Sequence, residues 1–278
     1  MAWPFTPLVS FIAGLTPKIT AEFLNSVQSA VNAVARPGYL DQTRCKYLCP
    51  DSATAQVVVS AAMIKDAATS EIVFCEYASA TLTPAYLTPT PAVTWPTSRW
   101  LYAYLVCTNG VASFEVSETG PDTTIARAPL WKTGDETRRY LISFYVDGSG
   151  ALYRGGSICG RYTYGDRVPV VSVTAGSTSL VPTSIATAVP PHALHAEIQG
   201  YGDNTYTSSN VVYVSPDGVG SISTFPILFV WTAYSGSGDR PWATGSLRLP
   251  LLNLDSIQWR TTSAGVSSLT INVTGWEE

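Results

Sequence analysis

The sequence predicts an all-β protein, made of antiparallel β-sandwich or jelly-roll-like domains preceded by a short N-terminal helix. Three observations support this fold class. Apolar residues recur at helical spacing between Thr16 and Val34, and Pro37-Gly38 then ends that pattern. Beyond Gly38, apolar and polar residues alternate in short runs that turn residues separate. Strands at such regular spacing are typical of antiparallel sandwiches and jelly rolls.

The length of the chain allows more than one domain. A chain of 278 residues can bury a substantial core, and two domains are a reasonable expectation. We expect residues 1–36 to form an N-terminal anchor and a short oligomerisation helix. Residues 37–167 are then a first β domain and residues 168–278 a C-terminal β domain, because the texture of the sequence changes around Asp166 to Pro169.

The first fifteen residues are too apolar for a free tail. The residues that we expect to act as an anchor are Trp3, Phe5, Phe11 and Ile12. Removing such side chains from water is favourable, so they should be covered by other protein. Two interpretations stay open: a strap that packs on its own β body, or a plug that inserts into a partner.

The following segment has the features of an amphipathic helix. Thr16 is a suitable N-cap, and Pro17 occupies the first helical position. An apolar stripe at coiled-coil spacing follows, formed by Leu24, Val27, Val31 and Val34. A helix this short is marginal by itself in water, so it must dock. It either packs on its own β domain or forms a short parallel bundle with other copies.

Strands are predicted throughout the first β domain. Residues 56–60, 71–77 and 100–107 are rich in Val, Ile, Tyr and Phe. Asn109-Gly110 lies between two such runs and predicts a hairpin. Proline and threonine dominate Leu82 to Pro96, which should be an extended surface loop. A strand at residues 139–146, a turn at residues 147–150 and a returning strand at residues 151–154 should follow.

The C-terminal part shows the clearest alternation. Residues 194–199 form a half-buried pattern, and residues 211–214 and 227–231 read as further strands. Two alternating runs end the chain, at residues 257–261 and 269–273, with a Ser-Ala-Gly turn between them. This arrangement predicts that the two runs pair with each other in a hairpin.

The composition excludes several function classes. Charged residues make up 13%, about half of the usual ~25%, and the net charge is −4. No cluster of Lys and Arg is present, which argues against nucleic acid as a partner. The longest apolar runs are far shorter than a membrane span, and the start lacks a secretory signal, so membrane insertion is not expected. Five thinly spread cysteines predict reduced thiols in a protein made in a reducing cytoplasm.

No catalytic, metal or cofactor site is expected. Cys45, Cys49, His192 and His195 could supply four zinc ligands, but their spacing does not match common zinc sites. A Ser-His-Asp triad would need one of the two histidines, and no G-x-S-x-G elbow is present. Most acidic residues stand in turn sequences, where Asp forms local hydrogen bonds. A polysaccharide-cleaving site built between subunits is the one enzymatic alternative that stays open.

Aromatic residues are abundant in or beside polar loops of the C-terminal part. The residues that could contact a glycan or a receptor are Tyr201, Tyr206, Trp231, Tyr234 and Trp242. Aromatic faces beside short polar side chains suit sugar rings. The other interpretation is that these rings pack at subunit interfaces or under loops.

Three segments give the chain a resemblance to virion proteins of tailed bacteriophages, of the tail-fibre, spike or head-fibre kind. The helix from Thr16 through Val34 is similar to the short helix that follows an apolar leader in such proteins. The segment Arg138 to Gly150 resembles their strand and glycine turn, and Leu269 to Trp276 resembles their terminal strand. The resemblance implies a homotrimer with the N-terminus toward the virion and the C-terminal β domain outward. Because this chain lacks a long coiled coil or β-helix shaft, it implies a short fibre, or a collar or decoration protein.

The function that we expect is therefore structural and non-enzymatic. The chain would be part of a virion assembled in the host cytoplasm. Its partners would be its own copies, other virion proteins contacted through the N-terminus, and a host-surface glycan. The alternative is a carbohydrate-active protein, either a lectin-like module or a surface-polysaccharide depolymerase. A third hypothesis is a secreted monomeric β-sandwich, against which the missing signal and the apolar stripe at residues 24–34 argue.

Overall fold

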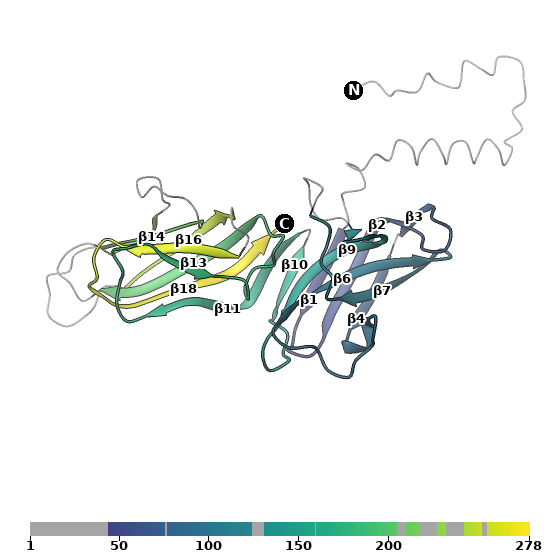
Figure 1. Ribbon diagram of the computed structural model, residues 1–278, viewed down its shortest axis with the longest axis horizontal. Helices are drawn as coiled ribbons and strands as arrows, with labels where there is room; N and C mark the ends of the chain where they lie inside the picture. The colour runs from purple at the N-terminus through teal and green to yellow at the C-terminus, as the bar shows by residue number, and fades with distance from the viewer. Residues whose placement is uncertain are drawn as a thin grey trace, which may run out of the picture. The chain divides into compact units, whose positions relative to one another are not determined.

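The structure is a computed structural model and describes residues 44–75, 77–123, 131–158, 160–204, 210–216, 227–231, 242–251 and 255–278. Within these ranges every regular element is a β-strand except η2, a 3-10 turn at Pro84–Tyr86 (Figure 1). The predicted all-β fold class is confirmed. The predicted anchor and helix, with Trp3, Phe5, Phe11, Ile12, Leu24, Val27, Val31 and Val34, lie outside the described residues and stay predictions.

The largest sheet has nine strands and is assembled from distant parts of the chain. Its strands in spatial order are β16 (Trp242–Pro250), β13 (His195–Asn204), β18 (Val266–Glu277), β11 (Arg161–Val173), β10 (Gly155–Ile158), β1 (Arg44–Cys49), β2 (Ala55–Lys65) and β3 (Ile72–Cys75). The ninth strand, β4 (Ala78–Leu82), also pairs with β2. The edge of β2 is thus shared by β3 and β4, which follow each other along it.

Two smaller sheets complete the described part. The four-stranded sheet has the order β12 (Val181–Ser184), β17 (Ser256–Thr261), β14 (Asn210–Pro216) and β15 (Ile227–Trp231). The five-stranded sheet has the order β5 (Leu87–Thr88), β7 (Val111–Ser117), β6 (Arg99–Thr108), β9 (Asp135–Val146) and β8 (Trp131–Lys132). All described strand pairs are antiparallel except β5 with β7. Antiparallel pairing agrees with the predicted sandwich class, whereas the jelly-roll topology stays a prediction.

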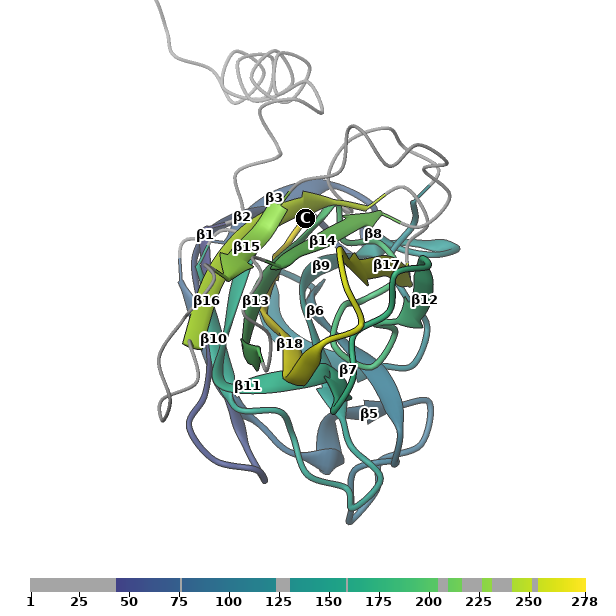
Figure 2. The same ribbon diagram turned by 90° about the vertical axis from the view of Figure 1, so that its left-hand side faces the viewer.

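The core forms where alternating apolar side chains of different sheets meet. Val212 and Val214 of β14 belong to the same buried cluster as Ile198 of β13 and Ile271 of β18. Figure 2 shows β14 and β15 beside β13 and β18. The four-stranded sheet therefore packs on the nine-stranded one, as the period of two in these strands requires.

The central strand β6 is buried on both faces. Leu101, Ala103 and Leu105 point into the main cluster, while Tyr102 and Tyr104 point to the opposite side and form a second cluster with Tyr140 of β9. A strand covered on both faces has a nearly continuous apolar sequence, which explains the run from residue 100 to residue 107.

The predicted hairpin at Asn109-Gly110 is confirmed. β6 pairs with β7 from Tyr102↔Ser117 to Thr108↔Val111. Asn109 and Gly110 both have positive φ, 51° and 77°, which a two-residue turn of this kind requires.

The predicted return after the next turn is only partly right, because residues 151–154 run back beside β9 without forming a regular strand. Asp147 forms the turn as expected, because its Oδ1 accepts hydrogen bonds from the backbone N–H groups of Ser149 and Ala151. Residues 151–154 then contribute an isolated antiparallel bridge between Val146 and Leu152, and the Tyr153 N–H donates to the Tyr145 carbonyl at 3.1 Å. The chain instead enters β10 at Gly155, which pairs with β1 and β11 in the large sheet.

The predicted hairpin at the end of the chain is wrong. β17 pairs with β12 and β14, whereas β18 pairs with β11 and β13. The turn at residues 262–265 connects two sheets and does not join neighbours in one sheet. The alternation correctly predicts two strands, but these strands do not pair with each other. It reflects the burial of Ile257 and Ile271 in the core between the sheets.

The predicted boundary near residue 167 is not marked by a break in secondary structure. Residues Gln42–Glu278 form one compact unit. β11 runs through Arg167 and pairs with β10 in its first half and with β18 along its length. The division of the β body into residues 37–167 and 168–278 stays a prediction.

Candidate functional site

Two open strand edges border a groove that we call the edge groove. One edge belongs to the segment of β3 and β4, which among the described strands pairs with β2 alone. The other edge belongs to β7, whose partner β5 reaches only Val116 and Ser117. Backbone N–H and C=O groups along an open edge are ready to pair with another extended chain.

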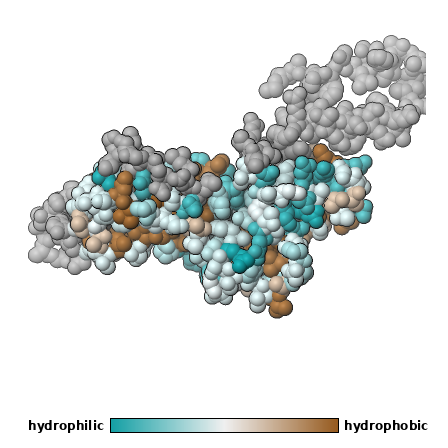
Figure 3. Space-filling model, in the orientation of Figure 1, coloured by the Kyte–Doolittle hydropathy of each residue, from teal (hydrophilic) through white to brown (hydrophobic). Residues whose placement is uncertain are grey.

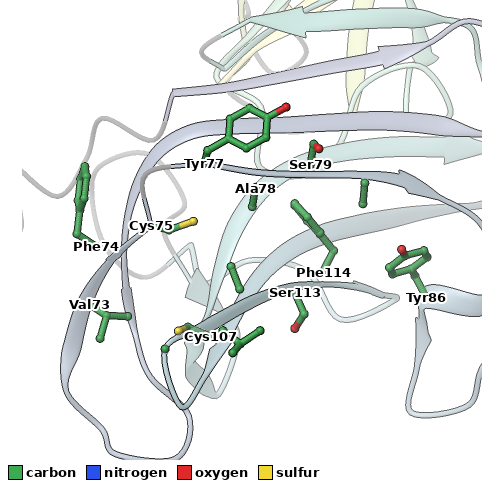
Figure 4. Close-up of a pocket in the computed structure, with 14 residues that line it drawn as sticks. Val73, Phe74, Cys75, Tyr77, Ala78, Ser79, Tyr86, Cys107, Ser113 and Phe114 are labelled. Carbon is green, nitrogen blue, oxygen red and sulfur yellow. The ribbon is translucent and has the colours of Figure 1, made fainter.

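The edge groove has a volume of about 890 Å³ and an uncharged lining in which apolar side chains stand beside a few hydroxyl groups. The lining residues are Val73, Phe74, Cys75, Tyr77, Ala78, Ser79, Ala80, Tyr86, Cys107, Gly110, Val111, Ala112, Ser113 and Phe114. Figure 4 shows Ala78 and Ser79 on one ribbon and Ser113 and Phe114 on another, with the Phe114 ring in the space between them.

Three large apolar side chains at the groove are exposed to solvent. Phe74 is 61% exposed, Tyr77 66% and Val111 68%. Single exposed apolar residues are ordinary, but a group of them beside an apolar groove marks an interaction site. Charged side chains are absent from the described lining. Its chemistry favours binding of an apolar, extended segment.

Asp66 holds the two sides of the groove together. The residue is buried and lies in the turn between β2 and β3. Its Oδ2 accepts hydrogen bonds from the Gly110 backbone N–H at 2.7 Å and from the Cys107 thiol at 3.3 Å. Its Oδ1 accepts from the N–H groups of Ala68, Thr69 and Asn109. One carboxylate therefore links the turn before β3 to the hairpin that begins β7.

The hydrogen bonds also set the ionisation of these groups. The Gly110 N–H, with smaller contributions from Ala68, Thr69 and Cys107, holds the pKa of Asp66 well below its ordinary value. Burial raises the pKa of the Cys107 thiol, and the Asp66 carboxylate raises it further. Burial likewise raises the pKa of Cys75. Neither thiol in the groove is therefore activated as a nucleophile.

The sequence analysis did not identify the edge groove or Asp66. The strand at residues 71–77 was predicted, but nothing in its pattern says that it is an edge. Asp66 is followed by Ala-Ala-Thr, and an Asp ahead of small residues is a signal for a local turn. Its bonds to Asn109 and Gly110 depend on tertiary packing that this signal does not reveal.

A buried polar cluster surrounds His192. Its Nε2 lies 3.0 Å from Tyr140 Oη, 3.3 Å from Ser143 Oγ and 3.0 Å from Glu278 Oε1. The Tyr140 hydroxyl also donates to Glu278. Serine, histidine and glutamate recur in hydrolase triads, but there the acid and the hydroxyl contact opposite ring nitrogens. Here Glu278 and Ser143 contact the same ring nitrogen, and Ser143 is buried. The cluster is therefore a buried hydrogen-bond network, and its geometry is not that of a triad.

The two cysteines and two histidines that were considered as zinc ligands, Cys45, Cys49, His192 and His195, belong to different parts of the fold. Cys45 and Cys49 are buried on β1, and within the described part of the chain neither forms a disulfide. His192 lies in the cluster just described, and His195 begins β13. Among the residues that the structure describes, no group of three or more His, Cys, Asp or Glu side chains is arranged to hold a metal ion.

The predicted glycan contacts are only partly visible. Tyr201 lies in β13, half-buried and opposite Thr244 of β16. Trp242 begins β16 and pairs with Asp203, two residues along the ladder from that position. Trp231 ends β15 opposite Asn210. Tyr206 and Tyr234 lie outside the described residues, so a joint glycan site of these five residues stays a prediction.

A search of the described part for membrane-spanning helices found none that is long and apolar enough.

Comparisons with known proteins leave the family of this chain open. No protein-family model matches it, and no curated protein matches it. One solved structure with a weak likeness is that of infectious bursal disease virus, Gx strain. It is 10% identical, with a TM-score of 0.14, and the match covers 84% of this chain and 66% of that chain. A likeness of this size carries no argument about fold or function.

Proposed function

We propose that this chain is a non-enzymatic structural protein of a tailed-bacteriophage virion, forming a short homotrimeric fibre attached through its N-terminus. The observation that supports this proposal most is the edge groove, with two open strand edges, an uncharged, largely apolar lining and exposed Phe74, Tyr77 and Val111. Stable monomers usually protect such edges with charge, proline or a covering segment. A strand edge at a subunit interface has to stay unprotected, because another subunit covers it in the assembly.

The weakly charged surface also supports an assembled protein. Pale colours cover much of the face seen in Figure 3, between brown apolar and teal hydrophilic patches. Only 13% of the residues carry charge. In this proposal residues 1–36 anchor the chain to other virion proteins and trimerise it, and the β body contacts neighbouring subunits or the host surface. The protein would be assembled into the virion in the host cytoplasm.

The mass in solution tests the proposal. Light scattering of the full chain should give about 89 kDa, which is three times 29.7 kDa. A chain that starts at Gly38 should have a lower mass if the N-terminal helix holds the trimer. Circular dichroism should show that this shorter chain keeps its β signal. A measured mass of 29.7 kDa for the full chain would show a monomer and contradict the proposed trimeric fibre.

Substitution in the edge groove should weaken assembly. Phe74→Lys places a charge on the open edge β3, where lysine prevents pairing with another strand. We expect the oligomer to dissociate at concentrations that leave the wild-type protein assembled, as measured by sedimentation velocity.

Val93→Lys is the matched control, because Val93 is 95% exposed and lies outside the groove lining. Neither substitution removes a buried group, so both variants should melt within about 2 °C of wild type. An unchanged oligomer in the Phe74 variant would show that the edge groove is not the subunit contact.

A further inference from the structure

A second hollow lies on the five-stranded sheet, under the loop from Leu87 to Pro96. It measures about 700 Å³, which is within the ~300–1,000 Å³ range of small-molecule sites. We call it the loop hollow. Its lining residues are Leu87, Thr88, Pro89, Thr90, Ala92, Thr94, Trp95, Pro96, Glu115, Ser117, Glu118, Thr119, Lys132, Asp135 and Arg138.

Paired charges form part of the lining. The Glu115 side chain is only 8% exposed and accepts hydrogen bonds from Lys132 Nζ at 2.5 Å and Arg138 Nε at 3.2 Å. Arg138 Nη1 also lies 3.1 Å from Asp135 Oδ2. Mutual pairing holds these groups in one arrangement, so their remaining donors and acceptors are presented to a ligand without a large loss of side-chain entropy.

Neutral hydroxyl groups make up much of the remaining polar lining. They come from Thr88, Thr90, Thr94, Ser117 and Thr119.

The loop above is fastened at two points. Thr88 Oγ1 donates to the Val116 carbonyl, and the buried Trp95 donates from Nε1 to the Ala53 carbonyl at 2.8 Å. The hollow is therefore formed before any ligand arrives.

The charges of the hollow nearly cancel. Three carboxylates, of Glu115, Glu118 and Asp135, face two cations, Lys132 and Arg138. The third carboxylate, Glu118, is paired at 2.6 Å with Arg99 outside the lining. The carboxylates would repel a strongly anionic ligand. A cationic ligand would have to compete with Lys132 and Arg138 for the same carboxylates. A neutral ligand rich in hydroxyl groups can use both, because each hydroxyl donates to a carboxylate and accepts from an ammonium or guanidinium group.

We propose that the loop hollow binds a short, neutral oligosaccharide. Hydroxyl groups of the sugar would bond to Glu118, Asp135, Lys132 and the threonine hydroxyls. The apolar faces of the sugar rings would lie on Pro89 and Pro96. This site lies outside the tyrosine and tryptophan positions predicted from the sequence, and it goes beyond the proposed assembly function, which does not require it.

Glycan binding by the full chain tests the site. The probe is an array of neutral and acidic oligosaccharides, followed by calorimetric titration with the best neutral ligand. We expect binding to neutral glycans and weaker or no binding to sialylated and sulfated ones. Absence of neutral binding, or binding confined to acidic glycans, would overturn the proposal.

Two matched variants locate the binding. Glu118→Gln removes a charged acceptor in the loop hollow, while Glu136→Gln removes an equivalent exposed carboxylate, paired with Lys65 outside the hollow. We expect the affinity to fall about tenfold for Glu118→Gln, since bonds to charged groups are worth more than neutral ones, and to stay unchanged for Glu136→Gln. Thr94→Trp, which fills the hollow from an exposed position, should abolish binding. Equal affinities of all three variants would place the ligand elsewhere.

The outcome is independent of the assembly test. If the protein is an 89 kDa trimer that binds no neutral glycan, the saccharide site is contradicted and the proposed structural function is supported. A monomer that binds neutral glycans, with loss in Glu118→Gln, supports the saccharide site and removes the trimeric fibre.

Discussion

Replacing Asp66 by asparagine is expected to lower the melting temperature by about 5 to 10 °C. Both carboxylate oxygens accept hydrogen bonds, Oδ2 from Gly110 and Cys107 and Oδ1 from Ala68, Thr69 and Asn109. Asparagine has one oxygen, so its NH2 group must face buried N–H donors on one side. Differential scanning calorimetry measures the loss, and assembly should weaken because Asp66 joins both sides of the edge groove.

Asp147→Asn is the control for this substitution. Asp147 also organises a turn, but the bonds from Ser149 and Ala151 all go to its Oδ1. An asparagine oxygen can accept the same bonds, so the melting temperature should change by less than about 2 °C. Equal losses in the two variants would mean that the second oxygen of Asp66 does not matter, contrary to its described role.

The pH dependence of stability provides an independent test of Asp66. Its pKa is held well below the ordinary value, chiefly by the Gly110 N–H. The folded state therefore gains stability from the carboxylate at pH values above the ordinary Asp pKa of about 3.9, and loses it as the pH falls below that value toward the folded pKa. Between about pH 4 and pH 2, the melting temperature of the wild type should fall more steeply than that of Asp66→Asn. Parallel curves would contradict the depressed pKa.

Trp276→Ala is expected to lower the free energy of unfolding by about 3 to 5 kcal/mol, a large part of the stability of a typical domain. Trp276 is fully buried on β18, between β11 and β13. Its ring stacks on Tyr162 with centroids 5.3 Å apart and meets the Trp100 ring edge-on at 6.3 Å. Removal of the ring leaves a cavity, because packed neighbours such as Tyr162 and Trp100 can move only partly into the space. Urea unfolding followed by fluorescence measures the change.

Phe74→Ala is the control for that loss. The Phe74 ring is also large and apolar, but it is mostly exposed, so its removal should change the free energy of unfolding by less than about 0.5 kcal/mol. The two variants thus separate core packing from surface contact. A small effect of Trp276→Ala would mean that the Tyr162 and Trp100 rings can close over the space.

Local patterns were sufficient for much of the fold. The period of two identified the strands, and Asn109-Gly110 identified its hairpin, because a two-residue turn with positive φ depends on adjacent residues alone. The run through β6 was also recognised, although its burial on both faces depends on Tyr140 and its neighbours. The sites were less predictable, because the edge groove and the loop hollow combine segments that no sequence spacing connects.

The end of the chain shows the division between local and tertiary information most clearly. Alternation at residues 257–261 and 269–273 correctly predicted two strands with one buried face each, since burial of every second residue is a property of the strand itself. Which strands are neighbours is a different question. β17 and β18 belong to different sheets, and their apolar side chains meet in the core between those sheets. The sequence thus determined the strands and their buried faces, and only the packing of sheets decided the pairing, the open edges and the hollows between them.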